Sequence, residues 1–202
     1  MNVVVVLGHP SANSYCAAIF NSIVSSLERQ HKVSAIRLAE ENFITAISSD
    51  ERQAYETQSP LISDETRRYA ILLQQAEALI FVYPTWWSGL PAQLKGWLER
   101  VFVLGVAFRF NNNGKIRPNL NNVQHIIGVS TYGSPWRYVK LVNDNGRRTL
   151  TRAIRASTGL RTRTMWHGLY ALDTRTAEQR KQFITETTEK IAKRLVDKGR
   201  TS

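Results

Sequence analysis

The sequence has one cysteine and no long apolar run. Because Cys16 alone can form neither an internal disulfide nor a cysteine-rich metal site, we expect a protein of the reducing cytoplasm with no metal centre. A membrane-spanning helix needs about 18 or more apolar residues in succession. The apolar run at 3–7 (VVVVL) has only five and follows no basic segment. These absences argue against membrane spanning and against secretion.

The glycine-rich motifs of two large nucleotide-binding classes are also missing from the first loop. After the first apolar run the chain reads GHPSANS (8–14), which contains neither the GxGxxG of dinucleotide-binding folds nor the GxxxxGK[ST] of P-loop NTPases. The sequence therefore gives little support to either class.

Acidic residues are scarce in the second half of the chain. The whole chain has 27 Lys and Arg against 16 Asp and Glu, a formal net charge of +11, and all of the positive excess lies beyond residue 100. Such a basic surface suits a phosphorylated small molecule, nucleic acid or an anionic membrane surface. Composition alone does not choose among them.

The remaining composition is that of an ordinary folded protein. Hydrophobic residues make up 43% of the chain and charged residues 21%, which provides enough apolar material for a buried core. A length of 202 residues fits one domain, and we expect residues 1–202 to form it.

Short apolar runs alternate with segments of helical periodicity. The apolar runs at Met1–Leu7 and Ala78–Tyr83 predict buried strands, and the alternation over Lys32–Leu38 predicts another. Two further strands are predicted at Val123–Ser130 and Thr162–Tyr170. Apolar residues at three- and four-residue spacing predict helices at Ser14–Gln30, Asp64–Gln75, Pro91–Leu104, Arg147–Ser157 and Ala177–Lys198. This alternation predicts an α/β fold with a five-stranded parallel sheet and helices on both faces.

Two stretches fall outside the alternation. Residues 39–63 are polar and only weakly periodic, so they receive no predicted structure. Phe108–Leu120 has Asn-Asn-Gly turn chemistry between short extended pieces, which predicts a hairpin-like insertion.

Ligands of an open parallel sheet bind beyond the carboxyl ends of its strands, which draws attention to the loops that follow them. The loop at 8–14 offers His9, serine hydroxyls and the N–H groups of a helix start, which suit a phosphate. The alternative is that Ser14 only caps its helix and His9 is an ordinary loop histidine.

The loops at 84–91 (PTWWSGLP) and 130–138 (STYGSPWRY) are rich in aromatic residues. Trp86 and Trp87 follow a buried strand directly, and two large aromatic surfaces need a cover. That cover is a planar ligand, a dimer interface or the Phe108–Leu120 insertion. Small residues in the second of these loops allow a ring to approach the backbone. A phosphorylated planar cofactor satisfies all three loops.

The strings GHPSANSY (8–15), VYPTWWSGLPAQLKGWLERVF (82–102) and STYGSPWRY (130–138) resemble the flavodoxin-like NAD(P)H:quinone oxidoreductase family. The resemblance implies the strand order 2-1-3-4-5, a homodimer and a bound flavin. FMN is favoured, with FAD as the alternative, because the long C-terminal extension of the larger FAD members is absent. By motif position, the implied cofactor-binding residues are His9, Ser14, Tyr15, Pro84, Thr85, Trp86, Trp87, Ser130, Thr131, Tyr132 and Gly133.

The implied activity is ping-pong transfer of two electrons from NAD(P)H to a quinone or a similar small-molecule acceptor. Tyr138 stands where the family often has an active-site tyrosine, which either donates a proton or stacks. The chain departs from the family pattern with Cys16 in place of a frequent Asn, with Tyr132 in place of a frequent Gly, and with no histidine at 141–148. The alternative function is a regulatory flavoprotein subunit that contacts a membrane transporter peripherally.

Six arginines gather in Arg147–Arg163, and helical spacing predicts that Arg148, Arg152 and Arg155 share one face. This cluster is either a solvated surface or a contact for the phosphates of NADPH, for an acidic partner protein or for nucleic acid. No nucleic-acid-binding motif accompanies the charge, so we expect no nucleic-acid partner.

Overall fold

The computed structural model describes residues 1–55, 57 and 59–196 of the chain. Its strands are β1 (Asn2–Leu7), β2 (Lys32–Arg37), β3 (Ala78–Pro84), β4 (Phe108–Phe110), β5 (Ile116–Pro118), β6 (His125–Thr131) and β7 (Arg163–Leu169). Its helices are α1 (Tyr15–Leu27), α2 (Ser49–Ala54), α3 (Asp64–Gln75), α4 (Ala92–Val101), α5 (Trp136–Leu141), α6 (Asn145–Arg148), α7 (Arg155–Thr158) and α8 (Ala177–Val196). A π-helical segment, η1 (Thr149–Ile154), joins α6 to α7, and a 3-10 turn, η2 (Leu172–Thr174), follows β7.

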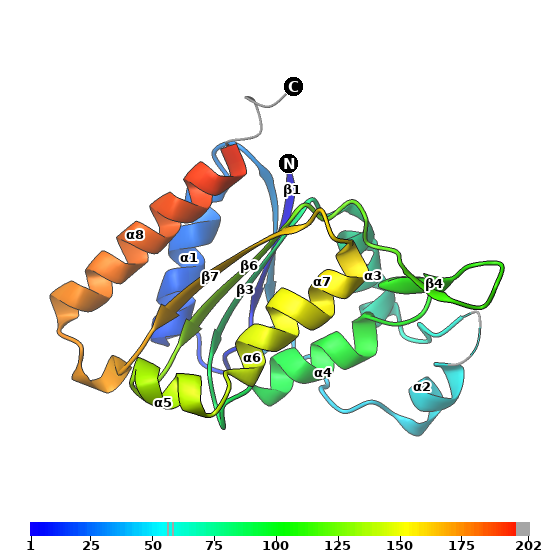
Figure 1. The fold of residues 1–202 in the computed structure, drawn as a ribbon, viewed down its shortest axis with the longest axis horizontal. Coiled ribbons are helices and arrows are strands. Elements are labelled where there is room, and N and C mark those ends of the chain that lie inside the picture. Colours follow the sequence, from blue (N-terminus) through cyan, green and yellow to red (C-terminus); the bar gives the residue numbers. More distant parts are fainter. Residues whose placement is uncertain (56, 58, 197–202) are drawn as a thin grey trace.

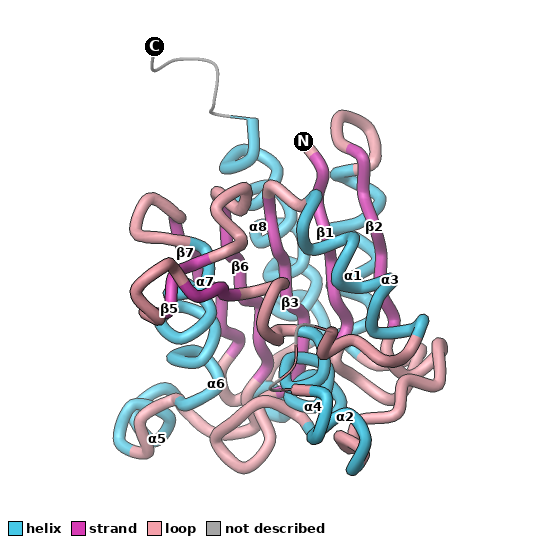
Figure 2. Tube along the Cα trace, turned by 90° about the vertical axis from the view of Figure 1, so that its right-hand side faces the viewer, coloured by secondary structure: helices cyan, strands magenta, loops and turns pink. Residues whose placement is uncertain are grey.

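Five parallel strands form one sheet in the order β2-β1-β3-β6-β7, which Figure 2 shows side by side. This confirms the predicted flavodoxin-like α/β fold and its strand order 2-1-3-4-5. The winding direction reverses between β1 and β3. Ligands of open α/β sheets bind at such a reversal, outside the carboxyl ends of the strands.

Helices cover both faces of the sheet (Figure 1). Successive side chains of a strand point to opposite faces, so Val3 and Val5 pack with α1 and α8, whereas Val4 and Val6 pack with α3, α4 and η1. The apolar run at 3–7 is continuous because both of its faces are buried.

Local sequence signals explain where the main helices begin. Ser14 caps α1 by accepting a hydrogen bond from the Ala17 N–H at 3.1 Å, and Ser63 caps α3 in the same way. Pro91 immediately precedes α4, where its missing N–H leaves no helical bond unmade. Among the described residues, no helix combines the length and the apolarity needed to cross a membrane.

The hairpin expected within Phe108–Leu120 is confirmed, since β4 and β5 pair antiparallel. The single α-helix expected over Arg147–Ser157 is instead α6, η1 and α7 in succession. The short helices α2 and α5 were not predicted, because six residues are too few to display an apolar period. The last predicted helix, Ala177–Lys198, corresponds to α8, and its final two residues, 197 and 198, lie outside the described part of the chain.

A buried ion pair anchors the polar excursion at 39–63 to α4. The Arg100 guanidinium donates through Nε and Nη2 to Glu51 Oε1, at 2.9 and 2.6 Å, and lies over the Phe43 ring. The Ser48 N–H donates to Glu51 Oε2 at 2.9 Å in a capping box that starts α2. Gly96 lets the excursion approach α4, because a Cβ there would lie 2.2 Å from the Thr45 carbonyl oxygen.

We predict that Glu51→Ala lowers the free energy of unfolding by about 3 kcal/mol, because it removes the closer of the two carboxylates beside a buried guanidinium and leaves only Glu65, at 3.5 Å. The matched control is Glu99→Ala, which removes the exposed pair with Lys95 and should cost less than about 1 kcal/mol. Denaturant unfolding of both variants measures the difference. Equal losses in the two variants would contradict the anchoring role.

The same prediction has a pH signature. Burial raises the pKa of Glu51, but hydrogen bonds from Arg100 and Ser48 outweigh burial and hold the pKa below its ordinary value. A lowered carboxyl pKa adds stability above the ordinary pKa of that group, and this stability disappears as the pH falls through the lowered value. The gap between parent and Glu51→Ala should therefore narrow in acid.

Candidate functional site

A cavity of about 660 Å³ opens at the carboxyl ends of β1, β3 and β6. The loops that follow these strands and β7, together with the first turn of α1, supply its lining: His9, Tyr15, Cys16, Pro84, Thr85, Trp86, Trp87, Thr131, Gly133, Ser134, Leu172 and Asp173. The three loops singled out in the sequence therefore meet at one place, which is the reversal point of the sheet.

The first loop presents hydrogen-bond donors to the cavity. The Ser11 N–H donates to His9 Nδ1 at 3.0 Å, which leaves Nε2 as the protonated nitrogen of the neutral ring. Partial burial lowers the pKa of His9, which favours that neutral form. The N–H groups of Tyr15 and Cys16 lie in the first turn of α1, where no intrahelical acceptor exists. Together these donors suit an anion.

Tyr15 and Cys16 form the wall beside these donors. The Tyr15 hydroxyl donates to the Arg180 carbonyl oxygen at 2.7 Å, which ties α1 to α8, and burial raises its pKa to about 12. Cys16 Sγ lies 3.4 Å from Thr131 Oγ1, and burial raises the pKa of the thiol to about 11. Cys16 is thus a neutral thiol at physiological pH and lacks the thiolate character of a reactive cysteine.

A strained turn carries Trp87 into solvent. Trp87 and Ser88 have positive φ angles of 48° and 57°, and the Gly89 N–H closes the turn on the Trp86 carbonyl oxygen at 3.0 Å. Left-handed backbone costs roughly 1–2 kcal/mol for each residue that has a Cβ. Trp87 is nevertheless fully exposed, so the Phe108–Leu120 insertion does not cover it. Strain that exposes an aromatic side chain beside a cavity points to a role in binding.

Hydrogen bonds join the second and third loops. The Thr85 N–H donates to the Thr131 carbonyl oxygen at 2.8 Å, and the Thr85 and Ser130 hydroxyls are 2.7 Å apart. Gly133 and Asp173 are neighbours in the cavity lining, since a Cβ on Gly133 would lie 3.4 Å from a carboxylate oxygen of Asp173. The hydrogen bonds between the two loops fix the position of this part of the lining.

A smaller cavity of about 200 Å³ adjoins the large one and shares four of its lining residues, Thr85, Trp87, Gly133 and Ser134. Tyr138 and Tyr132 line only this smaller space. The half-exposed Tyr138 comes from α5. Tyr132 is buried, donates from its hydroxyl to Asp144 Oδ2 at 2.9 Å and stacks on Tyr170 with ring centroids 4.5 Å apart.

The structure brings most of the predicted site residues to the large cavity, namely His9, Tyr15, Pro84, Thr85, Trp86, Trp87, Thr131 and Gly133. Ser14 and Ser130 do not line it: Ser14 caps α1, and Ser130 is buried behind Thr85. The lining residues that were not predicted are Cys16, Ser134, Leu172 and Asp173. The last two follow β7, whose carboxyl end reaches the same sheet edge, so the topology rule applied to that strand would have found them.

Comparisons with known proteins agree with this geometry. Residues 1–195 match the family described as having a flavodoxin-like fold. An uncharacterized NAD(P)H oxidoreductase of Haemophilus influenzae is 34% identical over 118 residues, which cover 57% of each chain. NAD(P)H dehydrogenase [quinone] 1 of Cavia porcellus is 27% identical over 150 residues, 66% of this chain and 54% of that one.

The fold also matches solved structures. An FMN-dependent NADH-azoreductase of Bacillus anthracis, solved in complex with FMN, superposes with a TM-score of 0.79 at 14% identity, covering 98% of this chain and all of that one. The chain spans little more than half the length of each of these two curated relatives. Because the family model matches residues 1–195, the chain belongs to the family described as having a flavodoxin-like fold.

Proposed function

We propose that the protein is an FMN-dependent oxidoreductase that transfers two electrons from NAD(P)H to a quinone-like small molecule. The observation that carries this proposal is the strained turn that holds Trp87 in solvent, beside a cavity of about 660 Å³ that reaches the first turn of α1. The quinone dehydrogenase of Cavia porcellus and the FMN complex of the Bacillus anthracis azoreductase support the choice of acceptor and of cofactor.

The residues of the large cavity fit a flavin mononucleotide. The first-turn N–H groups of α1 and His9 Nε2 provide donors for a phosphate. The loops at 84–87 and 131–134 provide the aromatic and small side chains that a planar ring needs, and Gly133 presents no side chain to it. A volume of about 660 Å³ lies within the range of about 300–1,000 Å³ typical of small-molecule sites.

When bound, FMN supplies the redox chemistry, taking a hydride from NAD(P)H and passing two electrons to the acceptor. The chain supplies position and electrostatics. With FMN bound, Trp86 and Trp87 would shield the ring from water, and main-chain N–H groups near Trp87 and Gly133 would stabilise negative charge on it. The hydrogen bonds of Thr85 to Thr131 and Ser130 fix the distance between the two loops that hold the ring.

The smaller cavity receives the two substrates in turn, which makes the reaction ping-pong. It adjoins the large cavity through Trp87 and Gly133, so a substrate in it lies against the flavin site. Tyr138 lines this space, and we assign its hydroxyl as the donor of a hydrogen bond or proton to the acceptor oxygen. No feature of the described residues favours the regulatory-subunit alternative over catalysis.

We predict that the purified protein is yellow, or takes up FMN, and that it completes both half-reactions. Without oxygen, NADH or NADPH should bleach the visible absorbance of the flavin, and a quinone added afterwards should restore it. Release of the cofactor by acid and measurement of its mass identify it. A colourless protein that binds neither FMN nor FAD in titration would contradict the proposal.

We predict that Trp87→Ala weakens FMN binding about fivefold or more, the loss expected from removing an aromatic contact worth about 1 kcal/mol. The matched control is Trp136→Ala, since Trp136 is also exposed but does not line the large cavity. Fluorescence titration of the apoprotein with FMN measures both affinities. Equal or reversed losses in two folded variants would move the ring away from the turn at Trp86–Gly89.

We predict that Tyr138→Phe slows the reoxidation of the flavin by a quinone by about 100-fold, the effect of removing a general acid. Stopped-flow absorbance separates this step from reduction by NAD(P)H, which should slow far less. If both steps keep the parental rate, Tyr138 only packs against substrates and another group delivers the proton.

A further inference from the structure

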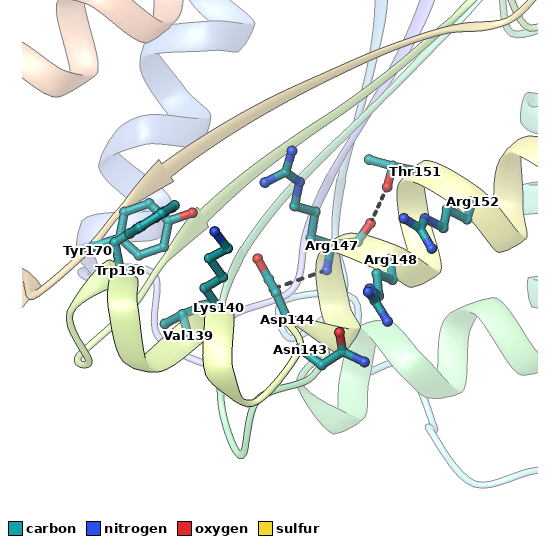
Figure 3. Close-up of a pocket in the computed structure, with 10 residues that line it drawn as sticks. All are labelled: Trp136, Val139, Lys140, Asn143, Asp144, Arg147, Arg148, Thr151, Arg152 and Tyr170. Atoms are coloured by element: carbon teal, nitrogen blue, oxygen red, sulfur yellow. Dashed lines mark hydrogen bonds between the residues drawn. The ribbon is translucent and has the colours of Figure 1, made fainter.

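A third cavity, of about 300 Å³, lies between α5 and the continuous helix formed by α6 and η1 (Figure 3). Four cationic side chains line it: Lys140 from α5, and Arg147, Arg148 and Arg152 from the facing helix. We call this space the basic cavity. The basic cavity shares no lining residue with the large cavity that is proposed to bind the flavin.

The positive charge of the basic cavity is unbalanced. None of the four cations forms an ion pair within the described part of the chain, whereas Arg100, Arg68 and Lys95 each have a carboxylate partner. The one carboxylate in the basic cavity, Asp144, already accepts hydrogen bonds from the Tyr132 hydroxyl and, at 3.4 Å, from the Arg147 N–H. Like charges gathered in this way repel one another, and an anion would relieve the repulsion.

The sequence grouped Arg148, Arg152 and Arg155 on one face, and the structure separates them. Arg148 and Arg152 line the basic cavity, but Arg155 does not, and its Nη2 donates to the Leu160 carbonyl oxygen at 2.8 Å. Arg152 lies within the π-helical segment η1, which changes the spacing of side chains along the helix. Short π-helical segments occur frequently at functional sites.

Two aromatic rings complete the basic cavity. Trp136 and Tyr170 both line it, and Trp136 is half exposed. Lys140 Nζ lies 5.0 Å from the centre of the Trp136 ring. A site with exposed aromatic surface and several guanidinium groups matches a ligand that joins a heteroaromatic ring to a phosphate, since arginine binds phosphate through paired, charge-assisted hydrogen bonds.

The basic cavity adjoins the substrate cavity beside the proposed flavin. Val139 lines both spaces. Tyr132, in the wall of the substrate cavity, is hydrogen-bonded to Asp144 and stacked on Tyr170, both of which line the basic cavity. A dinucleotide with its reactive ring in the substrate cavity would therefore extend its other end toward the arginines.

We propose that the basic cavity binds the 2′-phosphorylated adenosine end of NADPH and makes the protein select NADPH over NADH. NADPH and NADH differ only in the 2′-phosphate. Its negative charge would balance the positive charge of the four cations. This inference rests on the proposed oxidoreductase function, so its test includes a binding measurement that does not depend on turnover.

Calorimetric titration of the FMN-loaded protein compares adenosine 2′,5′-bisphosphate with adenosine 5′-monophosphate. We expect the bisphosphate to bind at least tenfold more tightly, and we expect Arg148→Ala/Arg152→Ala to remove this difference. The matched control, Arg161→Ala/Arg163→Ala, removes two exposed arginines outside the basic cavity and should keep the difference. Added salt should reduce the preference, because the four cations are solvent-exposed.

The rate of flavin reduction per unit concentration, measured for NADPH and NADH, completes the test. A parental preference for NADPH that falls toward unity in Arg148→Ala/Arg152→Ala supports the proposal. Reduction by both nucleotides without preference, or equal binding of the two adenosine probes, overturns it and leaves the oxidoreductase function standing. If the bisphosphate binds selectively but neither nucleotide reduces the flavin, the result contradicts the oxidoreductase function. It still supports the basic cavity as a phosphate-binding site.

Discussion

Parallel pairing of β1, β3 and β6 is the constraint on which the site depends. The pairing continues past the strand ends, where the Gly8 N–H donates to the Val82 carbonyl oxygen at 2.9 Å and the Thr85 N–H donates to the Thr131 carbonyl oxygen at 2.8 Å. These bonds hold three loops from distant parts of the sequence at fixed separations. The backbone around the cavity keeps its shape because the sheet beneath it is buried on both faces.

Above this rigid sheet, the chain tolerates local backbone strain at the place where a ligand would bind. Two residues with side chains adopt left-handed backbone in the turn at Trp86–Gly89, and the result is a fully exposed indole. Neither feature improves the stability of the folded chain. Four unpaired cations in the basic cavity are a second such cost. Both features lie around a set of adjoining cavities at the same edge of the sheet, which is where binding would compensate for them.

Much of this arrangement was predictable from sequence, and the rest depended on side-chain direction. Continuous apolar runs such as ALIFVY identified the strands because both faces of a parallel sheet are buried, and the loops that follow them located the cavity. Sequence could not show that Tyr132 turns toward Asp144, or that Ser130 lies behind Thr85, because tertiary contacts decide those orientations. It also could not separate Arg155 from Arg148 and Arg152, because the π-helical segment breaks the regular helical spacing.

A crystal structure of the protein with FMN tests the central claim most directly. The account predicts that the flavin ring lies between residues 84–87 and 131–134, with Trp87 against it, and that the phosphate contacts the first-turn N–H groups of α1. An FMN phosphate bound instead among Arg147, Arg148 and Arg152, or a ring away from the turn at Trp86–Gly89, would contradict the account.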